Sequence, residues 1–204
     1  MHHAMRRTVF RLFLVRSTVR VPESPVPCPL ARREHRAPVR LPMDLEPKRA
    51  SESETEMVQV VLPNDANPLG FILGGTVMHL IDIAGAIACH RHTRTLLVTA
   101  AVDDLQFLHS IKVGDLIILK SRVTCVFTTS LEVQVDVFSE ETLTGKRQLT
   151  SRAYLTFVAI DRNGARVKVA PLLVETDEGR IVCEQAHARR TQRLMKKADS
   201  TKQQ

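Results

Sequence analysis

Residues 76–91 read TVMHLIDIAGAIACHR, and this stretch decides the fold class. It is nearly continuously apolar, and its length favours an α-helix over a strand. Apolar side chains occupy almost every side of such a helix, so we expect other elements to wrap it. Its small residues, at positions 84–86 and at Ala88, would let the backbone of a sheet approach closely.

The segments around this helix have the character of β-strands. Five such runs are found, at residues 57–62, 96–108, 116–127, 131–137 and 148–161. In the fourth run Glu132, Gln134 and Asp136 alternate with apolar residues, which is the period of a half-exposed antiparallel strand. Residues 176–198 predict a second helix, with acidic residues at its start and basic residues near its end. One buried helix followed by four strands predicts an α+β fold, an antiparallel sheet curled around the helix.

The positive charge of the chain lies at its two ends. Of the net charge of +7, residues 1–50 contribute 11 Lys or Arg against 4 Asp or Glu, and residues 180–204 contribute 7 against 2. A nucleic-acid-binding protein places its basic residues on the folded domain, beside groups that stack on bases. The chain has no Trp and one Tyr, so we expect no nucleic-acid partner. No apolar run approaches the roughly 18 residues of a membrane-spanning helix, so we expect no membrane partner.

The first fifty residues differ in composition from the rest. They are rich in Arg and Pro, and no acidic residue precedes Glu23, which suits an organellar presequence. The alternative is an upstream extension of the reading frame, with Met43 as the true start. We therefore expect an extension or targeting segment at residues 1–50, a folded domain at 51–170 and a terminal helix with a basic tail at 171–204. The expected location is cytoplasmic, or mitochondrial if the first segment is a presequence.

The cysteines and histidines give no strong metal signal. Cys28, Cys89, Cys125 and Cys183 are scattered without a CxxC pair, which predicts neither a disulfide framework nor a zinc site. This cysteine usage predicts a reducing, intracellular compartment. The H-x-H of residues 90–92 has no third ligand at zinc spacing, so we expect no metal and no cofactor.

One carboxylate stands out in the apolar helix. Asp82 lies between Ile81 and Ile83, and an unpaired buried carboxylate costs several kcal/mol. Such a group is paired, hydrogen-bonded or kept for chemistry. The structural alternative is that Asp82 faces an interface or pairs with a base such as Lys112 or Arg122.

The loop before the helix offers groups that bind an oxyanion. Gly74 and Gly75 lie where the helix begins, so unpaired backbone N–H groups point outward from its first turn. These groups and the positive end of the helix dipole stabilise an oxyanion without a cationic side chain. Asn67 supplies an amide able to hold a water or a substrate carbonyl, although an Asn in a loop is commonly a turn former.

The pattern N-x-x-G-x-x-x-G-G from Asn67 to Gly75, followed by Asp82 on the helix, resembles the acyl-CoA thioesterases of the hotdog superfamily. Further likeness is found at Val98-Thr99-Ala100, Val102-Asp103, Phe107, Gly114-Asp115, Ser130 and Thr156–Ala159. It extends over about residues 55–165. Because it is spread over five elements, it is more specific than any single motif.

The resemblance implies a hotdog fold, a long helix wrapped by a curved antiparallel sheet. It also implies a homodimer whose sheets join edge to edge, often assembled into a trimer of dimers, with Asn67 of one chain working with Asp82 of the other. The implied reaction is hydrolysis of an acyl-CoA to free fatty acid and CoA. Asp82 would act as general base or as nucleophile, and Gly74 and Gly75 would bind the oxyanion.

By the same resemblance, Thr129 and Ser130 would bind the phosphopantetheine region of CoA. Two other functions stay open. A hotdog hydratase or dehydratase would need a His-containing loop before the helix, which the sequence lacks. A non-catalytic module that binds or senses acyl-CoA would bind the thioester without releasing free thiol.

Overall fold

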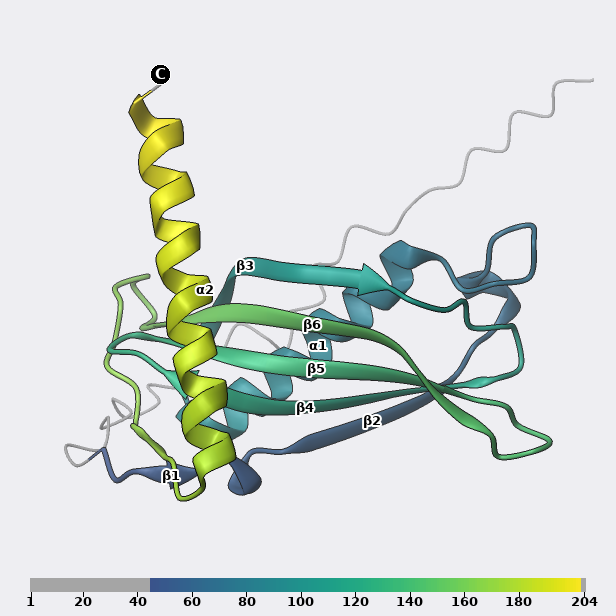
Figure 1. Ribbon diagram of the computed structural model, residues 1–204, viewed down its shortest axis with the longest axis horizontal. Coiled ribbons are helices and arrows are strands. Elements are labelled where there is room, and N and C mark those ends of the chain that lie inside the picture. Colours follow the sequence, from purple (N-terminus) through teal and green to yellow (C-terminus); the bar gives the residue numbers. More distant parts are fainter. Residues whose placement is uncertain (1–44, 203–204) are drawn as a thin grey trace, which may run out of the picture. The chain divides into compact units, whose positions relative to one another are not determined.

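The computed structural model describes residues 45–202, without the side chains of Asp104 and of residues 200–202 (Figure 1). Its centre is the helix α1, Gly74–Thr93, which contains the whole of the stretch predicted to be helical. The helix ends where Arg94 takes a left-handed conformation, with φ of 54°. Of the extension predicted at residues 1–50, residues 1–44 lie outside the described part of the chain.

Five antiparallel strands form the sheet in the order β2-β4-β5-β6-β3. Their bounds are β2 Thr55–Val60, β3 Leu96–Phe107, β4 Leu116–Val126, β5 Ser130–Glu140 and β6 Arg147–Ile160. All five strands predicted from the sequence are therefore present. Strands β2 and β3 are the two edges, and β3 follows α1 directly in the chain, so it runs back along the helix.

The face of the sheet toward α1 carries the apolar core. The alternation predicted for residues 131–137 is confirmed, because Leu131, Val133, Val135 and Val137 are all fully buried in this core. The helix approaches the sheet closely at Gly85. A Cβ atom added to Gly85 would lie 3.1 Å from Val133 Cγ1 and 3.2 Å from Phe157 Cε2. The small residues in the middle of α1 thus permit the close packing that the sequence predicts.

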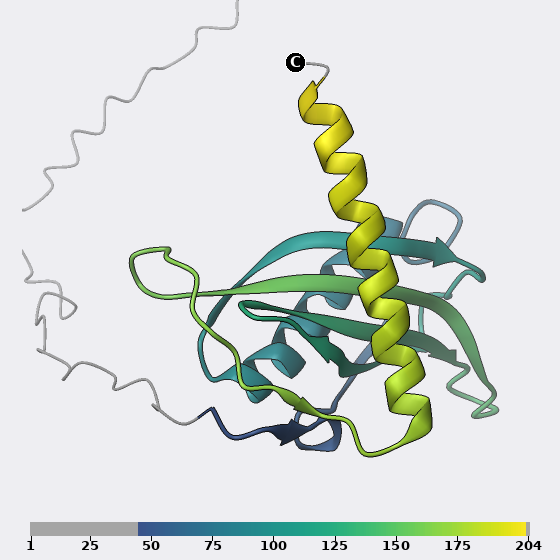
Figure 2. The same ribbon diagram turned by 60° about the vertical axis from the view of Figure 1, so that its left-hand side comes forward.

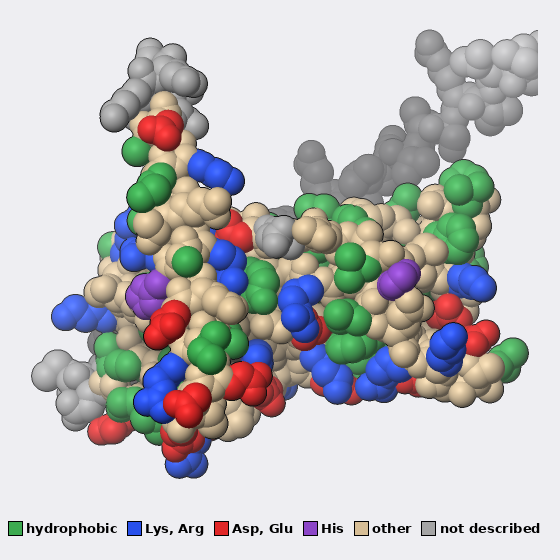
Figure 3. Space-filling model, viewed as in Figure 1, with side chains coloured by type: hydrophobic (Ala, Val, Ile, Leu, Met, Phe, Trp, Pro, Cys, Tyr) green, Lys and Arg blue, Asp and Glu red, His purple; other side chains and the backbone are tan. Residues whose placement is uncertain are grey.

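The helix α2, Asp177–Lys202, lies across the opposite face of the sheet (Figures 1 and 2). Figure 3 shows acidic and basic side chains on this face of the molecule, beside and along α2. The sequence predicted that the polar side chains of β5 would face water, and this is wrong for Glu132 and Gln134, which are both buried. Glu132 is only 1% exposed, because α2 covers it and Arg189 of α2 pairs with it at 2.7 Å.

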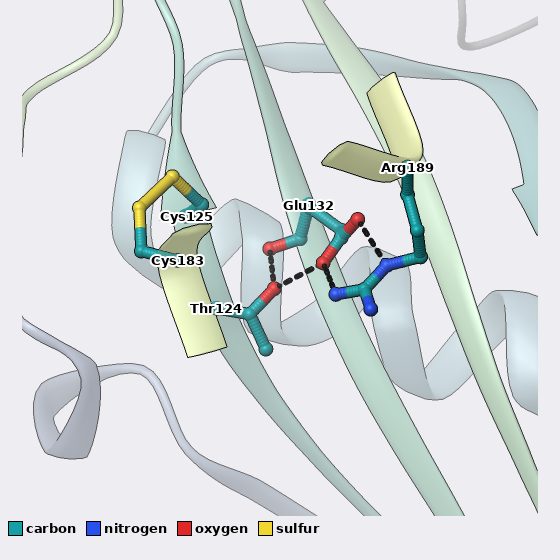
Figure 4. Close-up of a disulfide and its surroundings, with 5 residues drawn as sticks. All are labelled: Thr124, Cys125, Glu132, Cys183 and Arg189. Carbon is teal, nitrogen blue, oxygen red and sulfur yellow. Dashed lines mark hydrogen bonds and ion pairs between the residues drawn. A yellow bond between two sulfur atoms is a disulfide. The ribbon is translucent and has the colours of Figure 1, made fainter. Parts of the chain in front are cut away.

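A disulfide joins β4 to α2 (Figure 4). Cys125 and Cys183 are bonded, with their Cα atoms 4.9 Å apart and a sequence separation of 58. The expectation that the cysteines stay unpaired is wrong for this pair, because the position of α2 brings two distant thiols together. Cys89 of α1 is buried and free, and burial raises the pKa of its thiol.

Short elements complete the described residues. The two-residue strands β1, Lys48–Arg49, and β7, Leu172–Leu173, pair in parallel, and the 3₁₀ turns η2 and η3 span Ala50–Glu52 and Pro63–Asp65. Pro42–Gln204 forms one compact unit that includes α2. The division of the chain at residues 50 and 170 stays a prediction. Neither described helix contains an apolar stretch long enough to cross a bilayer.

Candidate active site

The loop that leads into α1 is held in shape by Asn67. Its side-chain Oδ1 accepts hydrogen bonds from the backbone N–H groups of Leu69, at 3.0 Å, and Phe71, at 3.2 Å. Gly70 takes a φ of 78°, which a residue with a side chain rarely adopts. Asn67 is therefore a turn former, but these bonds use only its oxygen, and no hydrogen bond of its NH₂ group is found among the described residues. Asn67 also lines a cavity beside this loop.

This cavity, of about 370 Å³, lies at the start of α1. Asn67 and Gly74 line it together with the apolar side chains of Phe71, Val77 and Phe107. The cavity therefore offers two polar groups at one place and an apolar wall beside them. This combination is typical of a small-molecule site.

The first turn of α1 presents free backbone donors. Its N-cap, Leu73, provides no side-chain hydrogen bond, and its own N–H donates to the carbonyl of Asp65 at 2.8 Å. The N–H groups of Gly74 and Gly75 lie in the first turn, where the helix itself offers no acceptor. A Cβ atom at Gly75 would meet nothing within 4 Å, so the space beside its Cα is open.

Asp82 lies two turns further along α1 and is half-buried. Its Oδ1 accepts a hydrogen bond of 2.7 Å from the hydroxyl of Thr99 on β3. Among the described residues no Lys or Arg pairs with it; Arg122, which the sequence offered as a partner, lies 4.0 Å from Glu178 instead. The carboxylate is thus held by a neutral hydroxyl and keeps its charge uncompensated.

Sequence reasoning did not assign a role to Thr99. A signal for it existed, because only two residues separate the end of α1 from the start of β3 and the strand must run back along the helix. Asp82 lies 11 residues before the last residue of α1, about 16 Å at 1.5 Å per residue. Thr99 lies at the fourth residue of β3, about 10 Å back along the strand. The lengths of these two segments therefore limit the residues of β3 that can contact Asp82 to a few, and Thr99 is among them.

Asn67 and Asp82 do not meet within one chain. The cavity that contains Asn67 lies beside Phe107, at the end of β3, whereas Asp82 is bonded to Thr99 near the beginning of β3. Asp82 does not line this cavity. The structure of the single chain therefore brings Asn67 together with Gly74, and Asp82 together with Thr99, as two separate half-sites.

The edge of the sheet between these half-sites is apolar. Among the described strands β3 has no neighbour on its outer side, and its exposed side chains include Leu96, Val98, Val102 and Phe107, the last 52% exposed. Met78 of α1 is exposed as well. An unpaired strand with exposed apolar side chains is a ready site for pairing with another chain.

Thr129 and Ser130 lie at the turn between β4 and β5. The carbonyl of Thr129 accepts a hydrogen bond from the N–H of Ala159, and the carbonyl of Ser130 accepts one from Phe127. Ser130 is buried, while Thr129 is partly exposed. The neighbouring Leu131 is in register with Phe157, which is in register with Thr99. The predicted CoA-binding pair therefore lies at the level of Thr99, two strands away in the sheet.

The H-x-H pair serves the structure of the helix end. The Nε2 of His92 is 2.9 Å from the carbonyl of Ala170, and the Nδ1 of His90 is 2.9 Å from the carbonyl of Thr95. Burial lowers the pKa of His92. His79, one turn before Asp82, is exposed and does not pair with it.

A long helix inside a curved antiparallel sheet, with a carboxylate and free backbone donors at its surface, defines a hotdog-type enzyme. A family model described as the thioesterase superfamily matches residues 69–146. A protein of Bacillus subtilis named as an acyl-CoA thioester hydrolase is 37% identical over 155 residues, which are 76% of this chain and 90% of the relative. The chain therefore belongs to the acyl-CoA thioester hydrolases of the thioesterase superfamily. By homology it is a thioester hydrolase.

Other relatives extend this comparison. The cytosolic acyl coenzyme A thioester hydrolase of the rat is 30% identical over 78% of this chain, and the chain spans 42% of that longer protein. The crystal structure of a hexameric acyl-CoA thioesterase has a TM-score of 0.71 at 37% identity, over 75% of this chain and 98% of that chain. An acyl-CoA hydrolase of Staphylococcus aureus, solved with butyryl coenzyme A and coenzyme A, has a TM-score of 0.70 at 32% identity, over 76% and 95%.

Solved structures of the Staphylococcus aureus enzyme include three alanine variants, of one asparagine, one aspartate and one threonine. In that enzyme the aspartate follows the asparagine by 15 positions, and the threonine follows the aspartate by 17. Here Asp82 follows Asn67 by 15 positions and Thr99 follows Asp82 by 17. The three residues of the two half-sites thus have the same spacing as the three altered there.

Proposed function

We propose that this protein hydrolyses acyl-CoA thioesters to a free fatty acid and CoA, with Asp82 as the residue that starts the reaction. The observation that carries the proposal is the half-buried carboxylate of Asp82, which bonds to the neutral hydroxyl of Thr99 and to no cation of the described chain. The equal spacing of asparagine, aspartate and threonine in the Staphylococcus aureus enzyme supports it.

Asp82 acts on the thioester through its free oxygen. Thr99 holds Oδ1 through its hydroxyl, and Oδ2 takes no part in this bond. As a general base, Oδ2 takes a proton from a water that attacks the thioester carbonyl. As a nucleophile, it attacks the carbonyl itself and forms a mixed anhydride that water then cleaves. Both routes release the CoA thiolate, and both use the same orientation of Asp82.

The developing oxyanion is bound by backbone donors. The N–H groups of Gly74 and Gly75 point out of the first turn of α1, where the helix dipole adds a positive field. The NH₂ group of Asn67, whose oxygen is held by the loop, orients the water or the substrate carbonyl. The apolar wall of Phe71, Val77 and Phe107 receives part of the acyl chain.

The two half-sites are joined by dimerisation through β3. When two copies of an edge strand pair in antiparallel fashion, the beginning of one lies beside the end of the other. This arrangement brings Thr99 and Asp82 of one chain toward Phe107, Gly74 and Asn67 of its partner. The apolar side chains exposed on β3 support this contact, and the hexameric relative supports a trimer of such dimers.

The remaining predictions belong to the same proposal. Thr129 and Ser130, at the level of Thr99 in the sheet, bind the phosphopantetheine region of CoA through hydroxyl and backbone groups. The protein works in the cytoplasm, a location supported by its likeness to a relative named as cytosolic.

Mixing two inactive variants tests the shared site. Asn67→Ala and Asp82→Ala each destroy a different half-site, so each homodimer is expected to lose activity. In a mixed dimer one site receives both defects and the other is complete. Co-refolded mixtures are expected to recover about a quarter of the wild-type rate, since half of randomly paired dimers are mixed and each has one complete site.

The measurement is release of free thiol from acyl-CoAs of increasing chain length. A mixture that stays inactive, although mixed dimers are present by mass spectrometry, contradicts the shared site. Wild-type protein that binds acyl-CoA but releases no thiol contradicts the hydrolase assignment. That result would favour a module that only binds acyl-CoA.

A further inference from the structure

Three side chains of types that can bind a metal ion lie close together where α2 crosses the end of β4. Cys125 lies next to the last residue of β4, and Cys183 and His187 lie four residues apart on α2. Residues at this helical spacing occupy the same face. The two sulfur atoms and a ring nitrogen of His187 all lie within 4.8 Å of one another, and Figure 4 shows the two cysteines facing each other between the strand and the helix.

His187 differs from the two histidines at the end of α1 in the hydrogen bonds of its ring nitrogens. His90 and His92 both bond to backbone carbonyls through a ring nitrogen. The ring of His187 contacts the edge or face of Phe127, with 5.1 Å between ring centres, and no hydrogen bond from its ring nitrogens is found among the described residues. Its lone pair is therefore available, and Phe127 fixes the plane of the ring beside the two sulfurs.

This donor set fits a thiophilic divalent cation. Zinc takes two thiolates and an imidazole at about 2.3 Å and 2.0 Å, with a water in the fourth position of a tetrahedron. Such a tetrahedron separates two sulfur ligands by about 3.7 Å, so the two sulfurs have to move apart once the disulfide is reduced, while the ring nitrogen of His187 already lies within 4.8 Å of both. Two thiolates also neutralise the charge of the ion. Calcium and magnesium prefer oxygen ligands and are excluded by this set.

We propose that the reduced protein binds one zinc ion through Cys125, Cys183 and His187, and that this ion and the disulfide are alternative clamps of α2 on β4. A dithiol reductant converts the protein disulfide into two thiols, transferring two electrons and two protons while it becomes a cyclic disulfide itself. Zinc then displaces one proton from each thiol as the two Zn–S bonds form. In a reducing compartment, where disulfides do not persist, the metal is the clamp that remains.

Binding of Co²⁺ to the reduced full-length protein tests the site. Tetrahedral Co²⁺ with thiolate ligands has intense visible bands and a thiolate-to-metal charge-transfer band, and Zn²⁺ is expected to displace it at one equivalent per chain. Cys183→Ser and Cys125→Ser are expected to lose the charge-transfer band, with at least about 100-fold weaker binding. His187→Ala is expected to keep a weaker band, because both thiolates remain.

Cys89→Ser is the matched control, since it removes the free thiol of α1, which lies outside the cluster. It is expected to bind Co²⁺ as the wild type does. A second measurement is alkylation of the reduced protein, in which Zn²⁺ should protect Cys125 and Cys183. The proposal is wrong if the reduced wild type binds Co²⁺ no better than Cys183→Ser, or if bound Zn²⁺ leaves both thiols equally open to alkylation.

Discussion

Asp82 and Glu132 are two carboxylates in apolar surroundings, one on each side of the same sheet. Glu132 is 1% exposed and makes a bidentate pair with Arg189, at 3.0 and 2.7 Å, as well as accepting a hydrogen bond from Thr124 (Figure 4). Asp82 is half-buried and bonds to the hydroxyl of Thr99. A carboxylate whose oxygens are all occupied by a cation holds the fold together, whereas one with a free oxygen is available for chemistry.

The two helices differ in the same way. The core between α1 and the sheet is apolar and close-packed around Gly85, so α1 is held by burial of side chains. The contact of α2 is dominated by the pairs of Arg189 with Glu132 and of Arg193 with Asp103, and by the disulfide. The guanidinium of Arg189 also lies 3.7 Å above the ring of Tyr154. We therefore expect substitutions on the two sides to separate activity from stability.

The sharpest test of the different roles of Asp82 and Glu132 replaces each carboxylate by the amide of the same shape. Asp82→Asn keeps the shape and the bond to Thr99 but removes the base or nucleophile, so kcat is expected to fall by about 10³-fold or more. The melting temperature should change little. Glu132→Gln should do the reverse, lowering the melting temperature while the enzyme that remains folded keeps its kcat. Loss of kcat in Glu132→Gln at a temperature where it is fully folded would contradict this division.

Removal of Arg189 tests how α2 is held. Arg189→Met leaves the carboxylate of Glu132 buried without its cation, which is expected to cost about 3 kcal/mol of unfolding free energy. The double variant Arg189→Met, Glu132→Gln should recover part of this loss, because no unpaired charge remains. Urea unfolding of the two single variants and the double variant gives the coupling free energy. A double variant that loses the sum of the two single losses would show that the ion pair contributes nothing beyond packing.

The elements of this fold could be predicted because each has a local signal in the sequence, which is a long apolar run for α1 and an alternation of polar and apolar residues for β5. The helix predicted at residues 76–91 spans Gly74–Thr93, and the alternation at residues 131–137 lies inside Ser130–Glu140. Asn67, Gly74 and Asp82 stood out because a turn, a pair of glycines and one charge interrupt apolar runs. These are local signals, and they needed no knowledge of which elements pack together.

The contacts of α2 could not be predicted, because they depend on where a helix lies on a sheet. The pattern of β5 shows that the side chain of Glu132 points away from the face that carries the core. It does not show that α2 covers this side chain with Arg189, 57 positions away. Cys125 and Cys183 are likewise separated by 58 residues, and neither belongs to a motif. Thr99 is the single threonine of β3, and only the run of β3 along α1 places it beside Asp82.

The hydroxyl of Thr99 gives a finer test of how Asp82 is positioned. Thr99→Val removes the bond to Oδ1 with little change in volume and is expected to lower kcat by about 10- to 100-fold, with a smaller change in KM. Thr99→Ser keeps the hydroxyl and should restore most of the rate. Steady-state kinetics of the wild type and both variants separate the change in kcat from the change in KM. An unchanged kcat in Thr99→Val would exclude a positioning role.

The smallest expected effect concerns the close approach of α1 to the sheet. In Gly85→Ala the new methyl group meets Val133 and Phe157 at about 3.1–3.2 Å, closer than ordinary contact. This overpacking opposes the gain of about 1 kcal/mol that Ala brings to a helix, so we expect a net loss of about 1 kcal/mol. Gln185→Ala on the exposed side of α2 adds no contact and should shift stability by less than about 0.5 kcal/mol. A rise in the melting temperature of Gly85→Ala would mean that the two side chains yield, and that the α1 contact is looser than its geometry indicates.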